Sequence, residues 1–383
     1  MPGYELISKE EKKEIESIFD NGGVLFRHGF DDRRNKTYKV LEFERNFAKK
    51  FNSKYSLAVT SGTAALRVAL SVLDLKKGDE VITQSFTFVA TVESIVESKA
   101  TPVCTEIDET LNMCPKSLEK LINKKTKAVI LVHMLGVPTD INKIIKICKK
   151  YKIPLIEDTA WGCGGKFNKK FLGTHGRMGT FSFDFAKLIT TGEGGMILFQ
   201  KKADYLKASA WHDHGHENNP KLPRWEDSRS SSGFNFRMTE MQGAIGIAQL
   251  RKMNDIIAKQ RKNYKSILSK LKNLNGIKLR KIPINAFYTA DALIFYVDNN
   301  KIAIKCRNEL LKFGISTKIL PEAISWHFSK KWSHIKELKN SKNNLLESEL
   351  ILSKAVSIPI LYFMKKNFPS KVFKALKIAL IDN

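Results

Sequence analysis

The chain has 383 residues, of which 43% are hydrophobic and 27% are charged. This apolar content excludes an intrinsically disordered chain, and the length excludes a small scaffold stabilised by disulfides. Sixty-five basic against 39 acidic side chains give a formal net charge of +26. Such an excess suggests a nucleic-acid partner, but the lysines are scattered and no DNA-binding motif accompanies them, so we expect none.

The sequence predicts a cytoplasmic protein that does not insert into a membrane. The best apolar tract, residues 355–364, is too short to cross a bilayer, and the first 19 residues lack the apolar core of a signal peptide. The five cysteines form no C-x-x-C pair. We therefore expect reduced cysteines with packing roles and no metal site.

Between about residues 54 and 200, short β-rich runs alternate with helical patterns. Strands are expected at 56–59, 80–83, 101–107, 128–132, 153–157, 179–183 and 195–199, and helices at 64–73, 92–97, 114–122 and 141–151. Nearly continuous apolar strands separated by helices are typical of a mostly parallel sheet that is covered on both faces. The predicted fold class is therefore α/β.

The second half of the chain has a different organisation. A polar stretch, 213–232, is predicted to be a long surface loop, and a long helix is expected after Met238. This helix would lead to a second domain of mixed α+β structure, from about residue 265 to the end.

Ligands of open α/β sheets gather at the carboxyl ends of the strands, so polar residues there are candidates for the site. Asp158 follows the expected strand 153–157, where it either caps a helix or faces a cationic partner. Lys187 follows the next strand, among Phe183, Phe185 and Leu188. A lone lysine is usually solvated, but apolar surroundings lower the pKa of an amine and make it a usable nucleophile.

Two further features belong to the same end of the sheet. Ser61-Gly62-Thr63 opens a helix, and the free amides of a helix start can hold an anion, although an ordinary N-cap has the same pattern. Phe88 follows another expected strand, where it belongs either to the core or to the face of a planar ring. An anion cradle, a strand-end carboxylate, an activated lysine and an aromatic ring together indicate a pyridoxal 5'-phosphate (PLP) pocket.

Seven segments carry a resemblance that covers essentially the whole chain: SGTAAL, SFTFVATVESI, HMLGVPTDI, IEDTAWGCGG, GTFSFDFAKLITTGEGGM, DHGH and GFNFRMTEMQGAIGIAQL. In these segments the chain resembles the DegT/DnrJ/StrS sugar aminotransferases. The resemblance implies the PLP-dependent transferase fold type I (aspartate aminotransferase-like). It would consist of a large PLP-binding α/β domain at 31–255 and a smaller α+β domain formed by 1–30 and 256–383.

The resemblance also implies roles for individual residues. Lys187 would form the Schiff base with the cofactor, and Asp158 would keep the pyridine nitrogen protonated. The remaining cofactor contacts would come from Gly62, Thr63, Ala64, Phe88, Trp161, Ser182 and Asn235. Asn235 would reach the phosphate of the neighbouring subunit, which implies a homodimer. Trp161 stands where family members usually carry Gln or His.

The histidines and several arginines are candidates for substrate contacts. His212, His214 and His216 alternate, but in a loop, so we expect no metal there. The resemblance places His214 or His216 at the substrate, and His327 in the sugar pocket. A cysteine desulfurase role for Cys163 has no support, because nothing beside it suggests an activated thiolate.

We therefore expect amino transfer from glutamate to a keto or aldehydo sugar. The segments MPGYEL, FRHGF and SWHFSKKWSHIKELK resemble the branch that forms 8-amino-3,8-dideoxy-manno-octulosonate in lipopolysaccharide sugar biosynthesis. Its acceptor, 8-oxo-3-deoxy-manno-octulosonate, is anionic and would suit Arg27, His28 and Arg237. The alternative acceptor is a nucleotide-linked keto-deoxyhexose of the perosamine type. A ligand sensor that keeps the fold, and a nucleic-acid binder, are the non-enzyme alternatives.

Overall fold

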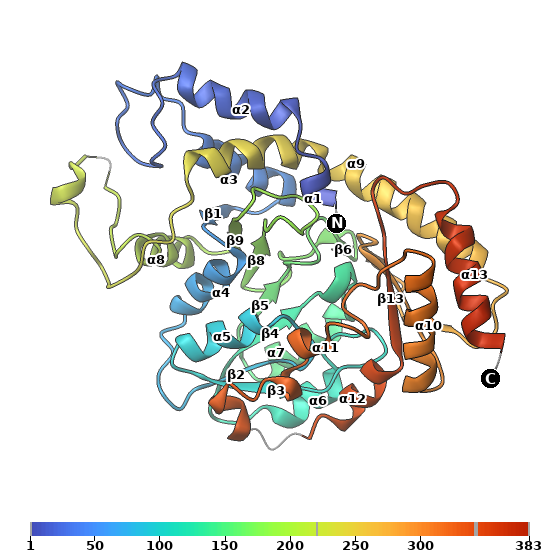
Figure 1. Ribbon diagram of the computed structural model, residues 1–383. Helices are drawn as coiled ribbons and strands as arrows, with labels where there is room; N and C mark the ends of the chain where they lie inside the picture. Colours follow the sequence, from blue (N-terminus) through green and yellow to red (C-terminus); the bar gives the residue numbers. More distant parts are fainter. Residues whose placement is uncertain (1, 220, 341–343, 382–383) are drawn as a thin grey trace.

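The structure is a computed structural model that describes residues 2–219, 221–340 and 344–381. A seven-stranded sheet lies at its centre (Figure 1). The strand order is β1 (Tyr55–Val59), β9 (Gly195–Phe199), β8 (Met178–Ser182), β5 (Leu155–Asp158), β4 (Thr126–Val132), β2 (Glu80–Gln84) and β3 (Thr101–Thr105). All neighbours are parallel except β9, which is antiparallel to both β1 and β8. The predicted seven-stranded, mostly parallel sheet is confirmed.

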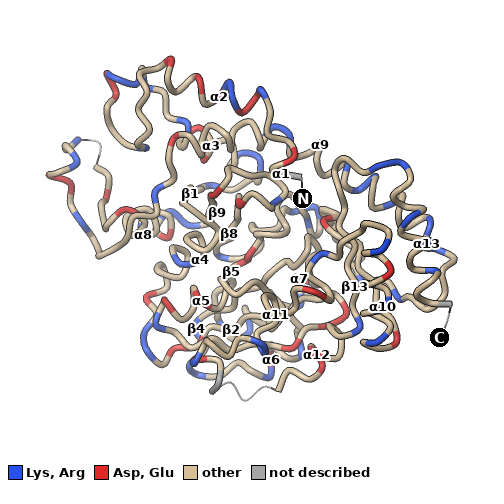
Figure 2. The backbone as a smooth tube through the Cα atoms, in the orientation of Figure 1, with Lys and Arg blue, Asp and Glu red and all other residues tan. Residues whose placement is uncertain are grey.

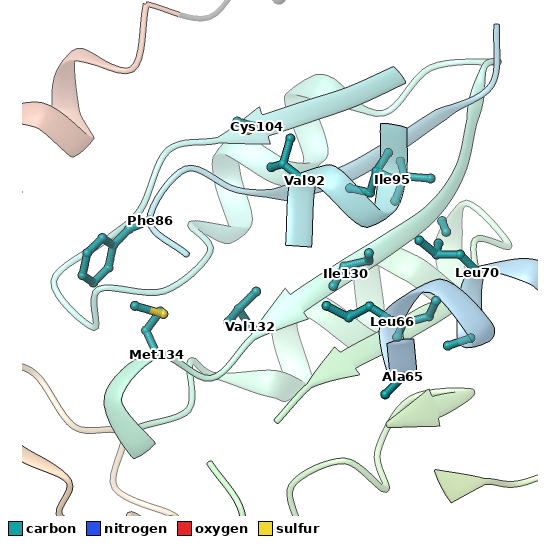
Figure 3. Packing of buried hydrophobic residues seen from close by; sticks show 14 of the residues in the cluster. Ala65, Leu66, Leu70, Phe86, Val92, Ile95, Cys104, Ile130, Val132 and Met134 are labelled. Carbon is teal, nitrogen blue, oxygen red and sulfur yellow. The ribbon is translucent and has the colours of Figure 1, made fainter. Parts of the chain in front are cut away.

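Helices cover this sheet, which explains why its strands are apolar along their whole length. The helices are α3 (Lys39–Phe51), α4 (Gly62–Ser71), α5 (Val89–Glu97), α6 (Pro115–Leu121), α7 (Ile141–Lys150) and α8 (Lys202–Trp211). Figure 3 shows side chains of α4, including Leu66 and Leu70, beside Ile130 and Val132 of β4. All four of these side chains are at most 4% exposed, so the floor beneath the strand ends is a packed core.

The long helix predicted after Met238 is α9 (Glu240–Leu271), which spans 32 residues. Thr239 begins it with a capping box, in which its hydroxyl accepts from the Gln242 amide and the Gln242 side chain accepts from the Thr239 amide. Figure 1 shows α9 running from the central sheet to the C-terminal elements. The predicted connecting helix is therefore present.

A second, antiparallel sheet forms the C-terminal part. It has the order β10 (Lys278–Leu279), β12 (Ala292–Tyr296), β13 (Ala355–Pro359). The helices of this part are α10 (Asn300–Lys312), α11 (Ile324–His327), α12 (Leu346–Ser353) and α13 (Phe368–Ile381). Buried side chains of α10, α13, β12 and β13 form a separate apolar cluster with the last turns of α9. We call this part the small lobe, and its boundary near residue 255 stays a prediction.

The seven-stranded sheet and the helices that cover it form the large lobe. The N-terminal segment lies against this lobe and α9 rather than against the C-terminal cluster. It contains α1 (Pro2–Glu5) and α2 (Lys9–Asp20). The Gly3 amide donates to the Lys187 carbonyl at 3.1 Å, and the Glu11 carboxylate pairs with Lys252 at 2.7 Å. Our grouping of residues 1–30 with the small lobe does not describe this packing.

Two irregular regions complete the fold. A small sheet of β6 (Lys166–Phe167), β7 (Lys170–Phe171) and β11 (Ala286–Phe287) joins the segment after β5 to the chain after α9. No pattern in the sequence predicted this sheet. The predicted loop 213–232 contains one short 3₁₀ turn, Arg224–Glu226, and projects from the body in Figure 1. We call this segment the excursion.

The basic residues are spread over the visible helices and loops rather than gathered in one stripe (Figure 2). Among the described residues, no helix is both long and apolar enough to cross a membrane. No three His, Cys, Asp or Glu side chains within the described ranges are grouped as metal ligands would be.

Candidate active site

A cavity of about 370 Å³ opens at the carboxyl ends of β4, β5 and β8, where helices α4 and α5 begin. This volume is within the range of small-molecule sites. Eight residues that the sequence predicts for the site line it: Gly62, Thr63, Phe88, Asp158, Trp161, Ser182, Lys187 and His327. The sheet topology therefore brings together positions that are 265 residues apart, from Gly62 to His327.

Asp158 is the last residue of β5 and only 4% exposed. One carboxylate oxygen accepts from the Ala160 amide at 3.1 Å, and the other accepts from the Thr91 hydroxyl at 3.0 Å. Thr91 is bonded in turn to the Thr87 hydroxyl at 2.9 Å. Burial raises the pKa of Asp158, while these hydrogen bonds and the charge of Lys187 oppose that rise. The carboxylate is held in one orientation at the cavity floor.

Lys187 lies in the turn between β8 and β9, half-buried against the cavity. Its Nζ lies 3.8 Å from the ring centroid of Trp161. Burial lowers the pKa of Lys187, and the carboxylates of Asp184 and Asp158 act in the opposite direction. A larger fraction of this amine is therefore neutral at a given pH than of a solvated lysine.

The start of α4 forms a cradle against the end of β8. Ser61 is the N-cap, and its hydroxyl accepts from the Ala64 amide at 3.0 Å, so Ala64 has no free amide for a phosphate. The preceding amides, of Gly62 and Thr63, belong to the helix start that lacks partners within the helix. A Cβ on Gly62 would lie 2.6 Å from the Ser182 Cβ. Only glycine allows the helix start and the strand end to approach this closely.

Rings form the side of the cavity that faces the small lobe. Phe88 is 40% exposed, and its centroid lies 5.6 Å from that of His327, which lies 6.5 Å from that of Trp161. Two backbone hydrogen bonds, from Thr87 to the His327 carbonyl and from Ser329 to the Ser85 carbonyl, fix the small-lobe segment to the loop after β2. The cavity is therefore shared between the two lobes.

The ring of His327 has one defined tautomer when it is neutral. Its Nδ1 lies 2.9 Å from the Ala323 carbonyl oxygen, and a carbonyl can only accept. Nδ1 therefore carries the proton, and Nε2 is an acceptor. Burial lowers the pKa of His327, which favours this neutral form.

The remaining predicted residues lie outside the cavity of this chain. Arg27 is buried in an ion pair with Glu44 at 2.9 Å and also donates to the Ala58 carbonyl. Its guanidinium is therefore committed to the interior, which does not support the expected substrate contact. Asn235 is exposed at the base of the excursion, and its side chain accepts from the Arg237 amide at 3.3 Å.

Asp213 pairs with three basic side chains at the base of the excursion. Its buried carboxylate pairs with His28 at 3.2 Å, with Arg224 at 2.5 Å and with Arg237 at 2.5 Å. Burial alone would raise the pKa of Asp213, but the His28 and Arg224 hydrogen bonds and the two arginine charges hold it well below its usual range. His28 and Arg237, predicted to bind substrate, instead fix this excursion.

The neighbouring histidines are separated from one another. His214 is exposed, with a positive φ of 55°, whereas His216 is buried and pairs with Asp227 at 3.2 Å. Neither lines the cavity of this chain. His212 is buried and lies 3.3 Å from an Arg27 nitrogen.

Sequence reasoning missed several cavity residues. Thr87 and Thr91 support Asp158 but stand in an apolar helix start, where threonine carries no distinct signal. Asp184 and Glu193 line the cavity near Lys187, and burial together with the Asp184 charge raises the pKa of Glu193. Their positions three residues before and six residues after Lys187 could have predicted that they lie near it.

These residues fit PLP. The helix start at Gly62 and Thr63, beside the Ser182 hydroxyl, offers hydrogen-bond donors to a phosphate, and the carboxylate of Asp158 at the cavity floor would pair with a pyridine nitrogen. Lys187 supplies the amine and Phe88 an exposed ring face in the same cavity. The donor set therefore suits a phosphorylated aromatic aldehyde.

Comparison with known proteins agrees with this geometry. The model of the DegT/DnrJ/EryC1/StrS aminotransferase family matches residues 30–377. The GDP-perosamine synthase of Vibrio cholerae is 35% identical over 318 residues, 79% of this chain and 83% of that protein. The GDP-perosamine synthase of Escherichia coli O157:H7 is 36% identical over 255 residues, 65% and 67% of the two chains.

A solved structure extends the likeness to the whole fold. The crystal structure of a GDP-4-keto-6-deoxymannose-3-dehydratase with a trapped PLP-glutamate geminal diamine is 27% identical, with a TM-score of 0.85 over 97% of this chain and 98% of that one. The names of these three relatives contain GDP-linked sugars, and none of the three names the octulosonate that we expected. The chain belongs to the DegT/DnrJ/EryC1/StrS aminotransferase family and is a PLP-dependent sugar aminotransferase.

Proposed function

We propose that this enzyme transfers an amino group from glutamate to the carbonyl of a nucleotide-linked keto-deoxyhexose. The observation that carries the proposal is the meeting of Lys187, Asp158 and the Gly62 cradle in one cavity, in a chain related to GDP-perosamine synthases. Glutamate is supported by the related dehydratase, which was trapped with PLP and glutamate. When bound, PLP supplies an aldehyde that links to an amine and a ring that accepts electrons.

Lys187 is proposed to act twice. Its neutral amine, favoured by burial, is the group that links to the cofactor. When it is not linked to the cofactor, the same Nζ would take a proton from the donor carbon as a base and return it as an acid. Asp158, held by Thr91 and the Ala160 amide, keeps a proton on the pyridine nitrogen.

The phosphate is proposed to bind at the amides of Gly62 and Thr63 and at the Ser182 hydroxyl, with Phe88 against the ring. Asn235 is exposed and outside the cavity of its own chain, which suits a contact with the partner subunit's cofactor. A homodimer is therefore part of the proposal. The excursion, fixed at its base by Asp213, would then present Asn235 to the partner.

The acceptor assignment can be tested in two half-reactions. Glutamate should first convert the enzyme to its amine-bearing form, seen as loss of the visible absorbance. Adding a GDP-linked 4-keto-6-deoxyhexose should then restore that absorbance, whereas 8-oxo-3-deoxy-manno-octulosonate should not. Restoration by the octulosonate alone would contradict the acceptor, and absence of any change with glutamate would favour a ligand sensor.

A further inference from the structure

A buried ion pair of the small lobe lies next to the cavity and has no part in the roles described so far. Lys318 is 6% exposed and Asp291 is 9% exposed, and Lys318 Nζ lies 2.5 Å from one Asp291 oxygen. The other oxygen is buried and has no hydrogen-bond partner among the described residues. Burying two charges has a large desolvation cost, so a buried ion pair is weak evidence for a stabilising role.

The backbone of the small sheet fixes both members of the pair. The Lys318 amide donates to the Ser357 carbonyl of β13 at 3.0 Å. Asp291 directly precedes β12, and its carbonyl accepts from the Ile360 amide at 3.3 Å. The pair is thus attached to a rigid sheet rather than to a mobile loop.

This anchored pair reaches Trp161, which lines the cavity. Lys318 Nζ lies 5.1 Å from the centroid of the Trp161 ring, and Lys187 Nζ lies 3.8 Å from it. Both amines therefore make cation–π contacts with the same indole ring, and the two distances place the amines within about 9 Å of each other. The segment before Asp291 is bound to the loop beneath, because the Thr289 amide donates to the Gly136 carbonyl at 3.2 Å.

We propose that the Lys318–Asp291 pair is a positioning element, which holds the Trp161 indole in place and thereby orients the Lys187 amine. Lys318 does not line the cavity, so it acts through Trp161 and not by contact with substrate. The proposal rests on the proposed function of Lys187 as the reactive amine. It makes the small lobe a support of the chemistry in the large lobe.

Electrostatics point in the same direction as the geometry. Burial is the main cause of the lowered pKa of Lys187, and the carboxylates of Asp184, Asp158 and Asp291 oppose it. The Lys318 charge lowers this pKa further. Removing the Lys318 charge should therefore raise the pKa of Lys187, whereas replacing Lys318 with arginine keeps the charge and should leave the pKa of Lys187 unchanged.

The first test uses the full chain without cofactor, so it depends on neither substrate. Trace acylation at a series of pH values, read by mass spectrometry of the Lys187 peptide, gives the midpoint of its reactivity. Lys318→Met should move this midpoint upward by about one pH unit, as expected for loss of a charge within about 9 Å. Lys318→Arg should keep the wild-type midpoint. An unchanged midpoint in folded Lys318→Met would overturn the proposal.

The second test uses the cofactor-loaded enzyme and a double-mutant cycle with Trp161→Phe. Lys318→Met should lower kcat with glutamate about 10-fold and leave the glutamate KM unchanged, because misplacement of a reacting group affects the chemical step. In the Trp161→Phe background the same change should have little further effect. A raised KM at constant kcat, or additive effects, would contradict action through Trp161.

Lys318→Met leaves Asp291 buried without its partner, which can prevent folding. The double variant Lys318→Met, Asp291→Asn removes both charges together and should fold. It should show the same loss of kcat, and a wild-type kcat would overturn the proposal. Borohydride trapping in each variant distinguishes failure of this proposal from failure of the proposed function. A label on another peptide would refute the role of Lys187 itself, whereas a label on Lys187 with unchanged kcat would refute only the positioning role of the Lys318–Asp291 pair.

Discussion

Thr91 gives the sharpest test of how the cavity holds Asp158. Thr91→Val keeps the shape of the side chain and removes the hydroxyl that donates to the Asp158 carboxylate at 3.0 Å. A hydrogen bond to a charged group contributes about 1.5–3 kcal/mol, so its loss should raise the pKa of Asp158 further, by about one to two units. Asp158 must be charged to hold a protonated pyridine nitrogen. The acid limb of the cofactor-affinity profile should therefore move to higher pH by the same amount.

The assay is an absorbance titration of the cofactor-free chain with PLP between pH 5 and 9. Thr87→Val is the matched control, because it removes only the bond to the Thr91 hydroxyl at 2.9 Å. It should shift the profile by less than about half a unit, since the contact with Asp158 remains. A wild-type profile for Thr91→Val, or a larger shift for Thr87→Val, would refute this account of the carboxylate.

Three further variants address other parts of the structure. Gly62→Ala should lower the free energy of unfolding by about 1–3 kcal/mol and weaken PLP binding, because its Cβ would lie 2.6 Å from the Ser182 Cβ; adding Ser182→Gly should restore the stability in a denaturant titration. Asp213→Asn should destabilise the chain by about 3–5 kcal/mol at pH 7. The lowered pKa of Asp213 stabilises the wild-type chain at neutral pH, and this stabilisation is lost on acidification. The difference in free energy of unfolding between wild type and variant should therefore decrease below about pH 4, and a constant difference would contradict the reasoning. His327→Asn, whose amide can still donate to the backbone, should raise the KM of the sugar about 10-fold and spare the glutamate half-reaction; equal effects on both would place His327 elsewhere.

The sequence was most informative where the neighbouring residues in the chain already indicated a residue's role. Asp158 ends an apolar strand and Lys187 stands among aromatic residues, so their types and positions alone suggested a site. The parallel order of strands then brings their ends together, as the apolar runs predicted. Both residues line the same cavity, and their roles stay a prediction.

Other features depended on contacts that no local pattern reveals. Arg27 and His28 looked like free cations for an anionic substrate, but Arg27 pairs with Glu44, 17 residues later, and His28 with Asp213, 185 residues later. Lys318 was indistinguishable from the many solvated lysines until the fold placed it at Trp161. Long-range ion pairing thus limits what a basic residue in a sequence can predict.

The most direct measurement is reduction of the PLP-loaded enzyme with borohydride, followed by peptide mass spectrometry. The reduced cofactor should be found on Lys187, and the Lys187→Ala variant should carry no label and no visible absorbance band. A stable label on any other lysine, with Lys187 unmodified, would contradict the account of this cavity.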